Sequence, residues 1–224
     1  MIPGNKLYYN TASPLLLEIL ISLMANHLFD EFRLVGGTGL SLQIGHRKSA
    51  DIDLFTDSVY GSIDFDAIDH YLHYHYPYVD TGDYRIIGMG KSYYIGNHKD
   101  DCIKLDLCYT DKFIEDIVFA DNIRLASIGE ITAMKIDVIS RGGRKKDFWD
   151  LHEVNENITL QQMLALHEKR YPFNHDPALI LEKLTDFRIA DQDFDPICLR
   201  GKHWEIIKLD MIDLVKTEKR ITKN

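Results

Sequence analysis

The chain has 224 residues, of which 45 % are hydrophobic and 27 % are charged, and its formal net charge is −9. These values indicate one large or two small globular domains, and the negative charge argues against a protein that coats nucleic acid nonspecifically. No apolar run approaches the roughly 20 residues of a membrane helix, and no signal peptide is expected. The three cysteines lack metal-ligand spacing and indicate reduced thiols, so we expect a cytoplasmic protein without a membrane partner.

The first half of the chain predicts helices interspersed with strands. Ser13 followed by Pro14 is typical of a helix start, and apolar spacing extends that helix to about Phe29. Gly90 and Lys91 are interpreted as a hairpin turn. Further helices are expected at 38–44 and 62–74, and strands at 32–35, 50–55, 84–89, 92–96, 102–109 and 123–126.

From Ser127 onward the pattern is helical. Ser127 and Glu130 form a predicted capping box, and the pair Gly142-Gly143 separates the first helix from the next. Helices are expected at 145–153, 159–169, 177–187 and from about 203, with a polar connection at 191–196. The fold class is therefore α+β: a mixed sheet with flanking helices in residues 1–126, followed by a helical C-terminal region in residues 127–224.

Two aspartates alternate along the strand predicted at 50–55. Asp51 and Asp53 project from one face because the side-chain period of a strand is two, while Ile52 and Leu54 are free to be buried. Two like charges at one spot need a countercharge, and a divalent cation is a natural one. A polar strand face without a metal is the alternative.

A glycine-rich turn precedes this pair. Gly36, Gly37 and Thr38 follow an apolar run and open a predicted short helix, so their amides are free to approach phosphate oxygens. Together with the acidic pair, the turn predicts a site for a metal-bound nucleotide. Gly36, Gly37, Thr38 and nearby Ser49 are the candidate nucleotide-binding residues.

A third acid lies on the strand predicted at 102–109. Asp106 shares a face with Lys104 and Cys108, whereas Ile103, Leu105 and Leu107 alternate with them. If this strand neighbours the strand of Asp51 and Asp53, the three carboxylates form a cluster able to hold magnesium ions. The alternative is a solvent-facing aspartate on an edge strand.

The helix predicted at 145–153 carries a second charged group. Lys146, Asp147 and Asp150 are three and four residues apart and lie on adjacent helix faces, so they either take part in the site or form intrahelical pairs on a solvated surface. Lys145 is expected to be exposed. Arg47 is either a phosphate contact or an exposed arginine.

These segments resemble the polymerase-β-like nucleotidyltransferase superfamily, through Val35-Gly36-Gly37-Thr38-Gly39-Leu40 and the following Asp51-Ile52-Asp53. More narrowly, Lys135, Arg141, Lys146-Asp147 and Asp150-Leu151 are similar to the second signature of the AbiEii/AbiGii toxin family. The resemblance covers about residues 30–155. It implies a Mg²⁺-dependent nucleotidyltransferase in a toxin–antitoxin or phage-defence system, using an NTP and encoded beside a cognate antitoxin protein.

The resemblance also implies roles for the residues. The expected metal ligands are Asp51, Asp53 and Asp106, and the expected catalytic set adds Lys135, Lys146, Asp147 and Asp150. The resemblance implies RNA as the acceptor, with the tRNA 3′ end as the example, and the basic segment 141–146 favours RNA. Two alternatives stay open: transfer to a small molecule such as an aminoglycoside, and a non-catalytic nucleotide-binding module that acts through a protein partner.

Overall fold

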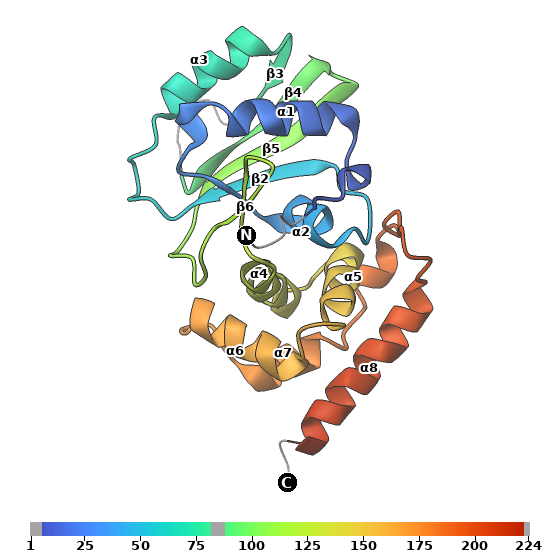
Figure 1. Ribbon diagram of the computed structural model, residues 1–224. Coiled ribbons are helices and arrows are strands. Elements are labelled where there is room, and N and C mark those ends of the chain that lie inside the picture. The colour runs from blue at the N-terminus through green and yellow to red at the C-terminus, as the bar shows by residue number, and fades with distance from the viewer. Residues whose placement is uncertain (1–5, 82–87, 222–224) are drawn as a thin grey trace. The chain divides into compact units, whose positions relative to one another are not determined.

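The computed structural model describes residues 6–81 and 88–221 (Figure 1). The chain divides into two compact units: Met1–Gly45 with Ser49–Ala126, and His46–Lys48 with Ser127–Asn224. Within the described ranges, no helix is long and apolar enough to span a membrane. The strand predicted at 84–89 lies mostly outside the described residues.

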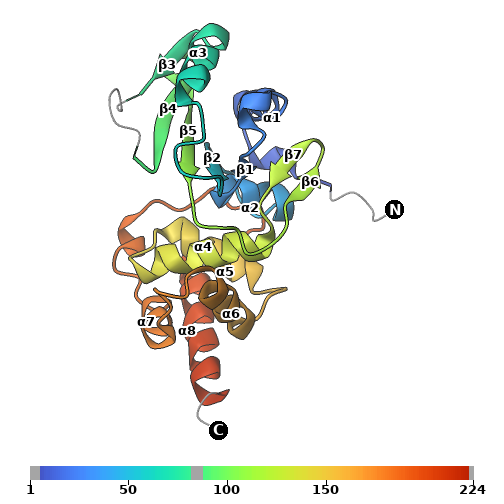
Figure 2. The same cartoon turned by 90° about the vertical axis from the view of Figure 1, so that its left-hand side faces the viewer.

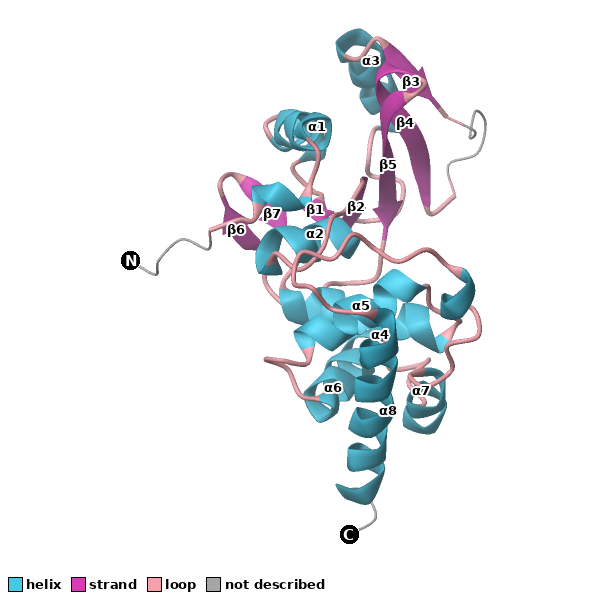
Figure 3. Cartoon of the chain, turned by 90° about the vertical axis from the view of Figure 1, so that its right-hand side faces the viewer, coloured by secondary structure: helices cyan, strands magenta, loops and turns pink. Residues whose placement is uncertain are grey.

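The first unit holds every strand of the described chain, as the magenta ribbons of Figure 3 show. The strands are β1 (Arg33–Leu34), β2 (Asp51–Thr56), β3 (Tyr78–Asp80), β4 (Gly90–His98), β5 (Asp101–Tyr109), β6 (Val118–Ala120) and β7 (Ile123–Leu125). They form one seven-stranded sheet in the order β3-β4-β5-β2-β1-β7-β6. Pairings β2–β5 and β1–β7 are parallel and the others are antiparallel, so the expected mixed sheet is confirmed.

In the described part of the first unit, the sheet is accompanied by α1 (Pro14–Met24), α2 (Gly36–Ile44) and α3 (Phe65–His75), which Figure 2 labels. The 3₁₀ helices η1 (Tyr9–Thr11) and η2 (His27–Phe29) lie in the same unit. Ser13 caps α1 as expected, because its hydroxyl accepts a hydrogen bond from the Leu16 amide, 3.1 Å away. The leucine-rich face of α1 and the apolar face of α3 pack into one core with alternate residues of β2, β4 and β5. This core covers one face of the central strands and leaves Asp51, Asp53 and Asp106 on the other.

The structure corrects the hairpin expected at Gly90-Lys91, since both residues lie within β4. Gly90 is opposite Cys108, and a Cβ on it would lie 2.2 Å from the Leu107 carbonyl oxygen. Close strand approach, rather than a turn, is therefore what requires glycine here. β4 pairs with β3 on one side and with β5 on the other, and β3 and β6 were not predicted from the sequence.

The second unit is helical in its described part. Its helices are α4 (Ile128–Ser140), α5 (Lys145–Val154), α6 (Leu160–Arg170), α7 (Pro177–Lys183), η3 (Ala190–Gln192) and α8 (Trp204–Ile221). Ser127 caps α4 by accepting from the Glu130 amide at 2.9 Å, and Gly142-Gly143 lies between α4 and α5 as expected. The Glu130 carboxylate pairs with Arg170 at 2.8 Å, across to α6. α7 ends four residues earlier than expected, at Lys183.

Candidate active site

Asp51, Asp53 and Asp106 lie on one face of the sheet in the first unit. The parallel pairing of β2 with β5 places Asp53 opposite Asp106 and Asp51 opposite Lys104. Paired strands are roughly 4.8 Å apart, so the three carboxylates start from neighbouring positions. This confirms the strand adjacency on which the three-acid cluster depended. An edge-strand position for Asp106 is wrong, because β5 lies between β4 and β2.

The glycine turn packs directly against Asp53. Gly36 has a φ of +65°, and a Cβ on it would lie 2.1 Å from Asp53 Oδ2. The left-handed conformation and the close approach both require glycine. The Val35 amide donates to the Asp53 carbonyl at 2.9 Å, which fixes the turn to β2. Gly36 therefore sets the position of the Asp53 carboxylate.

Thr38 ties the same turn to the start of β2. Its side chain is buried, and its hydroxyl contacts the Asp51 carbonyl oxygen and lies 2.9 Å from Ser49 Oγ. Gly36 and Gly37 open α2, whose N-cap residue, Val35, has no side-chain oxygen to cap the first amides. The turn therefore offers its backbone amides, while the Thr38 hydroxyl links α2 to β2.

Asp106 has a neighbour at each carboxylate oxygen. The Ser92 hydroxyl donates to Oδ1 at 2.6 Å, and the Lys104 ammonium forms an ion pair with Oδ2. Burial lowers the pKa of Lys104, but Asp106, Asp53 and Asp51 together raise it above its usual value. Burial, Asp106 and Asp53 raise the pKa of the nearby Cys108 thiol to about 11, which keeps it neutral at pH 7.

This face carries oxygen donors of the kind that bind divalent cations. Carboxylate and hydroxyl oxygens are the hard ligands that divalent cations prefer, and the Lys104 ammonium pairs with Asp106 on this face. Within residues 6–81 and 88–221, no group of three or more His, Cys, Asp or Glu side chains is arranged to hold a metal ion. Asp106 is instead engaged by Lys104 and Ser92.

Asp150 is the centre of a separate, buried charge cluster in the second unit. Its carboxylate is fully buried and receives Arg47 Nε at 2.6 Å, Arg47 Nη2 at 2.8 Å and Lys135 Nζ at 2.8 Å. His46 Nε2 lies 2.7 Å from Oδ1. Lys135 also pairs with Asp147 at 2.6 Å. Inside the second unit, the positive charges of Arg47 and Lys135 therefore face the negative charges of Asp147 and Asp150.

The segment that carries Arg47 joins the second unit through backbone pairing. Arg47 and Cys198 form an antiparallel bridge, and the Lys48 amide donates to the Ile197 carbonyl at 2.9 Å. Arg47 is 3 % exposed, so its interpretation as an exposed arginine is wrong. Its guanidinium binds Asp150 in a bidentate arrangement, which is the strong form of this ion pair.

Charge–charge interactions within the buried cluster determine the protonation states of Asp150 and Lys135. Burial raises the pKa of Asp150, but Arg47, Lys135 and the His46 hydrogen bond outweigh it and hold that pKa well below its usual value. Burial lowers the pKa of Lys135, and Asp150 and Asp147 more than restore it. Both groups are therefore charged at neutral pH.

Asp147 has a second function at the start of α5. Its Oδ2 accepts from the Arg144 amide at 3.0 Å, which caps the helix, while Oδ1 pairs with Lys135. The solvated-surface interpretation of the charged group is wrong for Asp147 and Asp150, because both are buried and pair with a different helix. Lys146 is half-buried on the same helix.

The basic segment 141–146 is largely neutralised by aspartates. Arg141 pairs with Asp137, and Arg144 pairs with Asp193 at 3.0 Å. Lys145 is buried and pairs with Asp195 at 2.7 Å, so the expectation that it is exposed is wrong. The segment therefore offers less unbalanced positive charge to a polyanion than its composition suggests.

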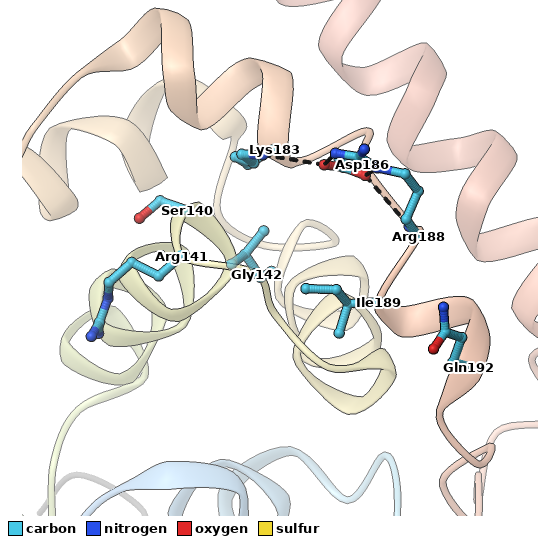
Figure 4. A pocket seen from close by; sticks show the side chains of 9 residues that line it. Ser140, Arg141, Gly142, Lys183, Asp186, Arg188, Ile189 and Gln192 are labelled. Carbon is cyan, nitrogen blue, oxygen red and sulfur yellow. Dashed lines mark hydrogen bonds and ion pairs between the residues drawn. The ribbon is translucent and has the colours of Figure 1, made fainter.

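A cavity of about 390 Å³ lies within the second unit, beside the end of α4 (Figure 4). Lys183 and Arg188 both reach Asp186 there, at 3.2 and 2.6 Å, and Arg141 lines the same cavity. None of the predicted site residues lines it, so we do not assign the nucleotide to this cavity.

Three residues that contact the predicted ones had no role assigned from the sequence: His46, Ser92 and Lys104. His46 immediately precedes Arg47, and Lys104 is two residues from Asp106, so the period of a strand was a usable signal for Lys104. Ser92 and His46 meet their partners across 14 and 104 residues, which no local pattern encodes. The three cysteines are free thiols.

Comparison with known families gives one match over most of the chain. The family model described as nucleotidyl transferase AbiEii toxin, Type IV TA system, matches residues 18–220. An uncharacterized protein of Aquifex aeolicus is 27 % identical over 184 residues, which cover 79 % of this chain and 83 % of that protein.

Solved structures show the same fold. MenT4, a nucleotidyltransferase toxin from Mycobacterium tuberculosis, superposes with a TM-score of 0.55 at 13 % identity, covering 88 % of this chain and 79 % of MenT4. JHP933 from Helicobacter pylori gives a TM-score of 0.54 at 18 % identity and covers 92 % of each chain. The polymerase-β-like core expected from the sequence is thereby confirmed.

Replacing Asp150 with Asn should strongly destabilise the second unit. The change removes the carboxylate charge that pairs with both Arg47 and Lys135, and these two cations remain buried. We expect a loss of about 3–5 kcal/mol in the free energy of unfolding, measured by urea denaturation at pH 7. Asp213→Asn, which removes an exposed partner of Lys216, is the control and should lose about 1 kcal/mol or less. Equal losses in the two variants would contradict a structural role for the cluster.

The same cluster predicts a pH dependence of stability. Because the pKa of Asp150 is lowered in the folded state, its stabilising contribution is complete above the unfolded-state pKa of about 4 and is lost as the pH falls further. Urea denaturation of the wild type should therefore show a steeper loss of stability below about pH 4 than denaturation of Asp150→Asn. Parallel curves would show that Asp150 is not the titrating group.

Proposed function

The chain belongs to the AbiEii family of nucleotidyltransferase toxins, and we propose that it uses Mg²⁺ to transfer a nucleotide from an NTP to an acceptor hydroxyl. One observation carries this proposal: the β2–β5 register sets Asp53 opposite Asp106, with the glycine turn packed against Asp53. The carboxylates and the phosphate-binding amides therefore belong to adjacent segments: β2, β5 and the glycine turn.

The first unit supplies the nucleotide end of the site. The amides of Gly36 and Gly37 approach the β- and γ-phosphates, and the dipole of α2 favours their negative charge. Thr38 and Ser49 are linked by a hydrogen bond beside the glycine turn. Because Thr38 is buried, we propose that it positions the turn rather than binding phosphate directly. Gly36 aligns the Asp53 carboxylate with the bound phosphates.

The three aspartates carry the chemistry. Asp51, Asp53 and Asp106 would hold divalent metal, which supplies charge neutralisation on the phosphates. Asp106 also helps to remove the proton of the acceptor hydroxyl. The hydroxyl oxygen forms a bond to the α-phosphorus as the bond from that phosphorus to the bridging oxygen breaks, and pyrophosphate leaves.

Two lysines are assigned to the leaving group. In this proposal Lys135 and Lys146 neutralise charge that develops on the leaving pyrophosphate. Asp147 and Asp150 are positioning residues for Lys135, since each accepts an ion pair from its ammonium within the second unit. Arg47 shares Asp150 with Lys135, so we assign it to the same supporting group rather than to direct phosphate binding.

The acceptor is proposed from the family resemblance, and the partner from the description of the family as a Type IV TA system. We propose RNA as the acceptor, with the tRNA 3′ end as the first candidate, and a cognate antitoxin protein as the partner. The basic segment 141–146 gives little additional support for RNA, because Arg141, Arg144 and Lys145 are each paired with an aspartate.

A label-transfer assay tests the activity. The protein is incubated with each [α-³²P]NTP, total tRNA and either Mg²⁺ or a chelator. We expect Mg²⁺-dependent labelling of RNA, none on tRNA whose 3′ ends were oxidised with periodate, and none from [γ-³²P]NTP. Asp53→Asn should reduce the rate by at least a hundredfold, because it removes a metal ligand. Asp57→Asn, one residue beyond β2, is the matched control and should stay active.

The outcomes separate the alternatives. Absence of Mg²⁺-dependent transfer, or undiminished transfer by Asp53→Asn, would contradict the enzyme proposal and favour a binding module. Label that appears on an aminoglycoside but never on RNA would identify a small-molecule transferase. Label transferred from the γ-position would show that phosphate, rather than nucleotide, is moved.

Replacing Gly36 with Ala should impair activity without comparable loss of stability. The new Cβ would meet Asp53 Oδ2 at 2.1 Å, so the carboxylate must rotate away. Gly61→Ala is the matched control, because Gly61 also has positive φ but a Cβ on it meets nothing within 4 Å. Both variants should lose about 1 kcal/mol of stability, whereas only Gly36→Ala should lose most of its label transfer. Equal activity in the two variants would contradict the positioning role of Gly36.

A further inference from the structure

Lys104 is placed among the acids by the pairing of the central strands. It lies two residues before Asp106 on β5 and directly opposite Asp51 on β2. Ser92 of β4 is opposite Asp106 on the other side. Residues opposite one another in paired strands share a face, so Lys104, Ser92 and the three aspartates all belong to the face opposite the core.

The contacts of Lys104 are those of a countercharge. Its ammonium pairs with Asp106 Oδ2, and Asp51 and Asp53 add to the same favourable field. The Lys104 side chain is 36 % exposed, so its flexible stem can carry the ammonium into solvent without breaking the core. Asp106 is 18 % exposed and receives Ser92 on its remaining oxygen.

We propose that Lys104 is the internal counterion of the three-aspartate site and that a divalent metal must displace it from Asp106 to bind. This inference rests on the proposed function, in which the same three aspartates hold the metal. A divalent cation and an ammonium repel each other when they share carboxylates, and both cannot occupy the same oxygen of Asp106. Lys104 therefore weakens metal binding and stabilises the acidic face when metal is absent.

This role differs from that of an ordinary surface ion pair. A surface pair would change neither the affinity for metal nor the dependence of stability on metal, since it acts only on its own partner. A counterion exchanges with the metal, so removing its charge should tighten metal binding while lowering stability in a chelator. The two changes have opposite signs, which a general structural defect does not produce.

Mn²⁺ binding to the full chain, without nucleotide, tests the exchange. Binding is followed by the electron paramagnetic resonance signal of free Mn²⁺ at pH 7. We expect Lys104→Gln to bind Mn²⁺ about tenfold more tightly than the wild type, or more, because a competing charge is removed. Lys104→Arg, which keeps the charge, should remain near the wild type. Lys99→Gln, an exposed lysine at the turn between β4 and β5, should leave the affinity unchanged.

Thermal melting gives a second measurement. In a chelator, Lys104→Gln should melt at a lower temperature than the wild type, since Asp106 then loses its ion pair with the Lys104 ammonium. Saturating Mn²⁺ should raise its melting temperature by more than it raises that of the wild type, because tighter binding to the folded state stabilises it further. Lys104→Arg should again resemble the wild type.

The Mn²⁺ measurements distinguish failure of the counterion role from failure of the proposed metal site. Equal Mn²⁺ affinity in the wild type and Lys104→Gln, with binding abolished in Asp53→Asn, would refute the counterion role and leave the proposed metal site intact. Mn²⁺ binding that is weaker in Lys104→Gln would also refute it. Absence of Mn²⁺ binding in every variant would overturn both the inference and the metal dependence on which it rests.

Discussion

The parallel pairing of β2 with β5 is the constraint on which the first unit depends. Buried Ile52 and Leu54 on β2 pack beside Leu105 and Leu107 on β5, so the apolar alternation of both strands fixes one register. A slip by one residue would turn the acids into the core and the leucines outward. Packing and chemistry therefore cannot vary independently here, and the same alternation that builds the core presents the acidic face.

The two units use aspartate in physically different ways. In the first unit the acids are partly exposed, and Asp106 pairs with the partly exposed Lys104, which is able to exchange for another cation. In the second unit Asp150 is fully buried and balanced by Arg47 and Lys135, so exchange there would expose unpaired charge. We therefore propose the aspartates of the first unit as metal ligands and those of the second unit as positioning residues, although the residue type is the same in both.

Local patterns predicted what local geometry controls. The glycine turn and the three acids follow from alternation and backbone freedom, and the conditional position of Asp106 was confirmed by its strand pairing. The burial of Arg47 and Lys145 could not be predicted locally because their partners, Asp150 and Asp195, lie 103 and 50 residues away. Strand β3 was missed because its three residues show no buried alternation. Partners that are distant in the sequence, and short edge strands, are therefore identified only from the tertiary structure.

The most direct test of the account is the position of metal in a crystal with Mn²⁺ and a non-hydrolysable NTP analogue. Anomalous diffraction at the manganese edge locates the ion independently of the protein coordinates. We predict manganese bound by Asp51, Asp53 and Asp106, with Lys104 no longer paired to Asp106 and the phosphates at the amides of the glycine turn. Manganese and nucleotide bound away from these aspartates would contradict the account.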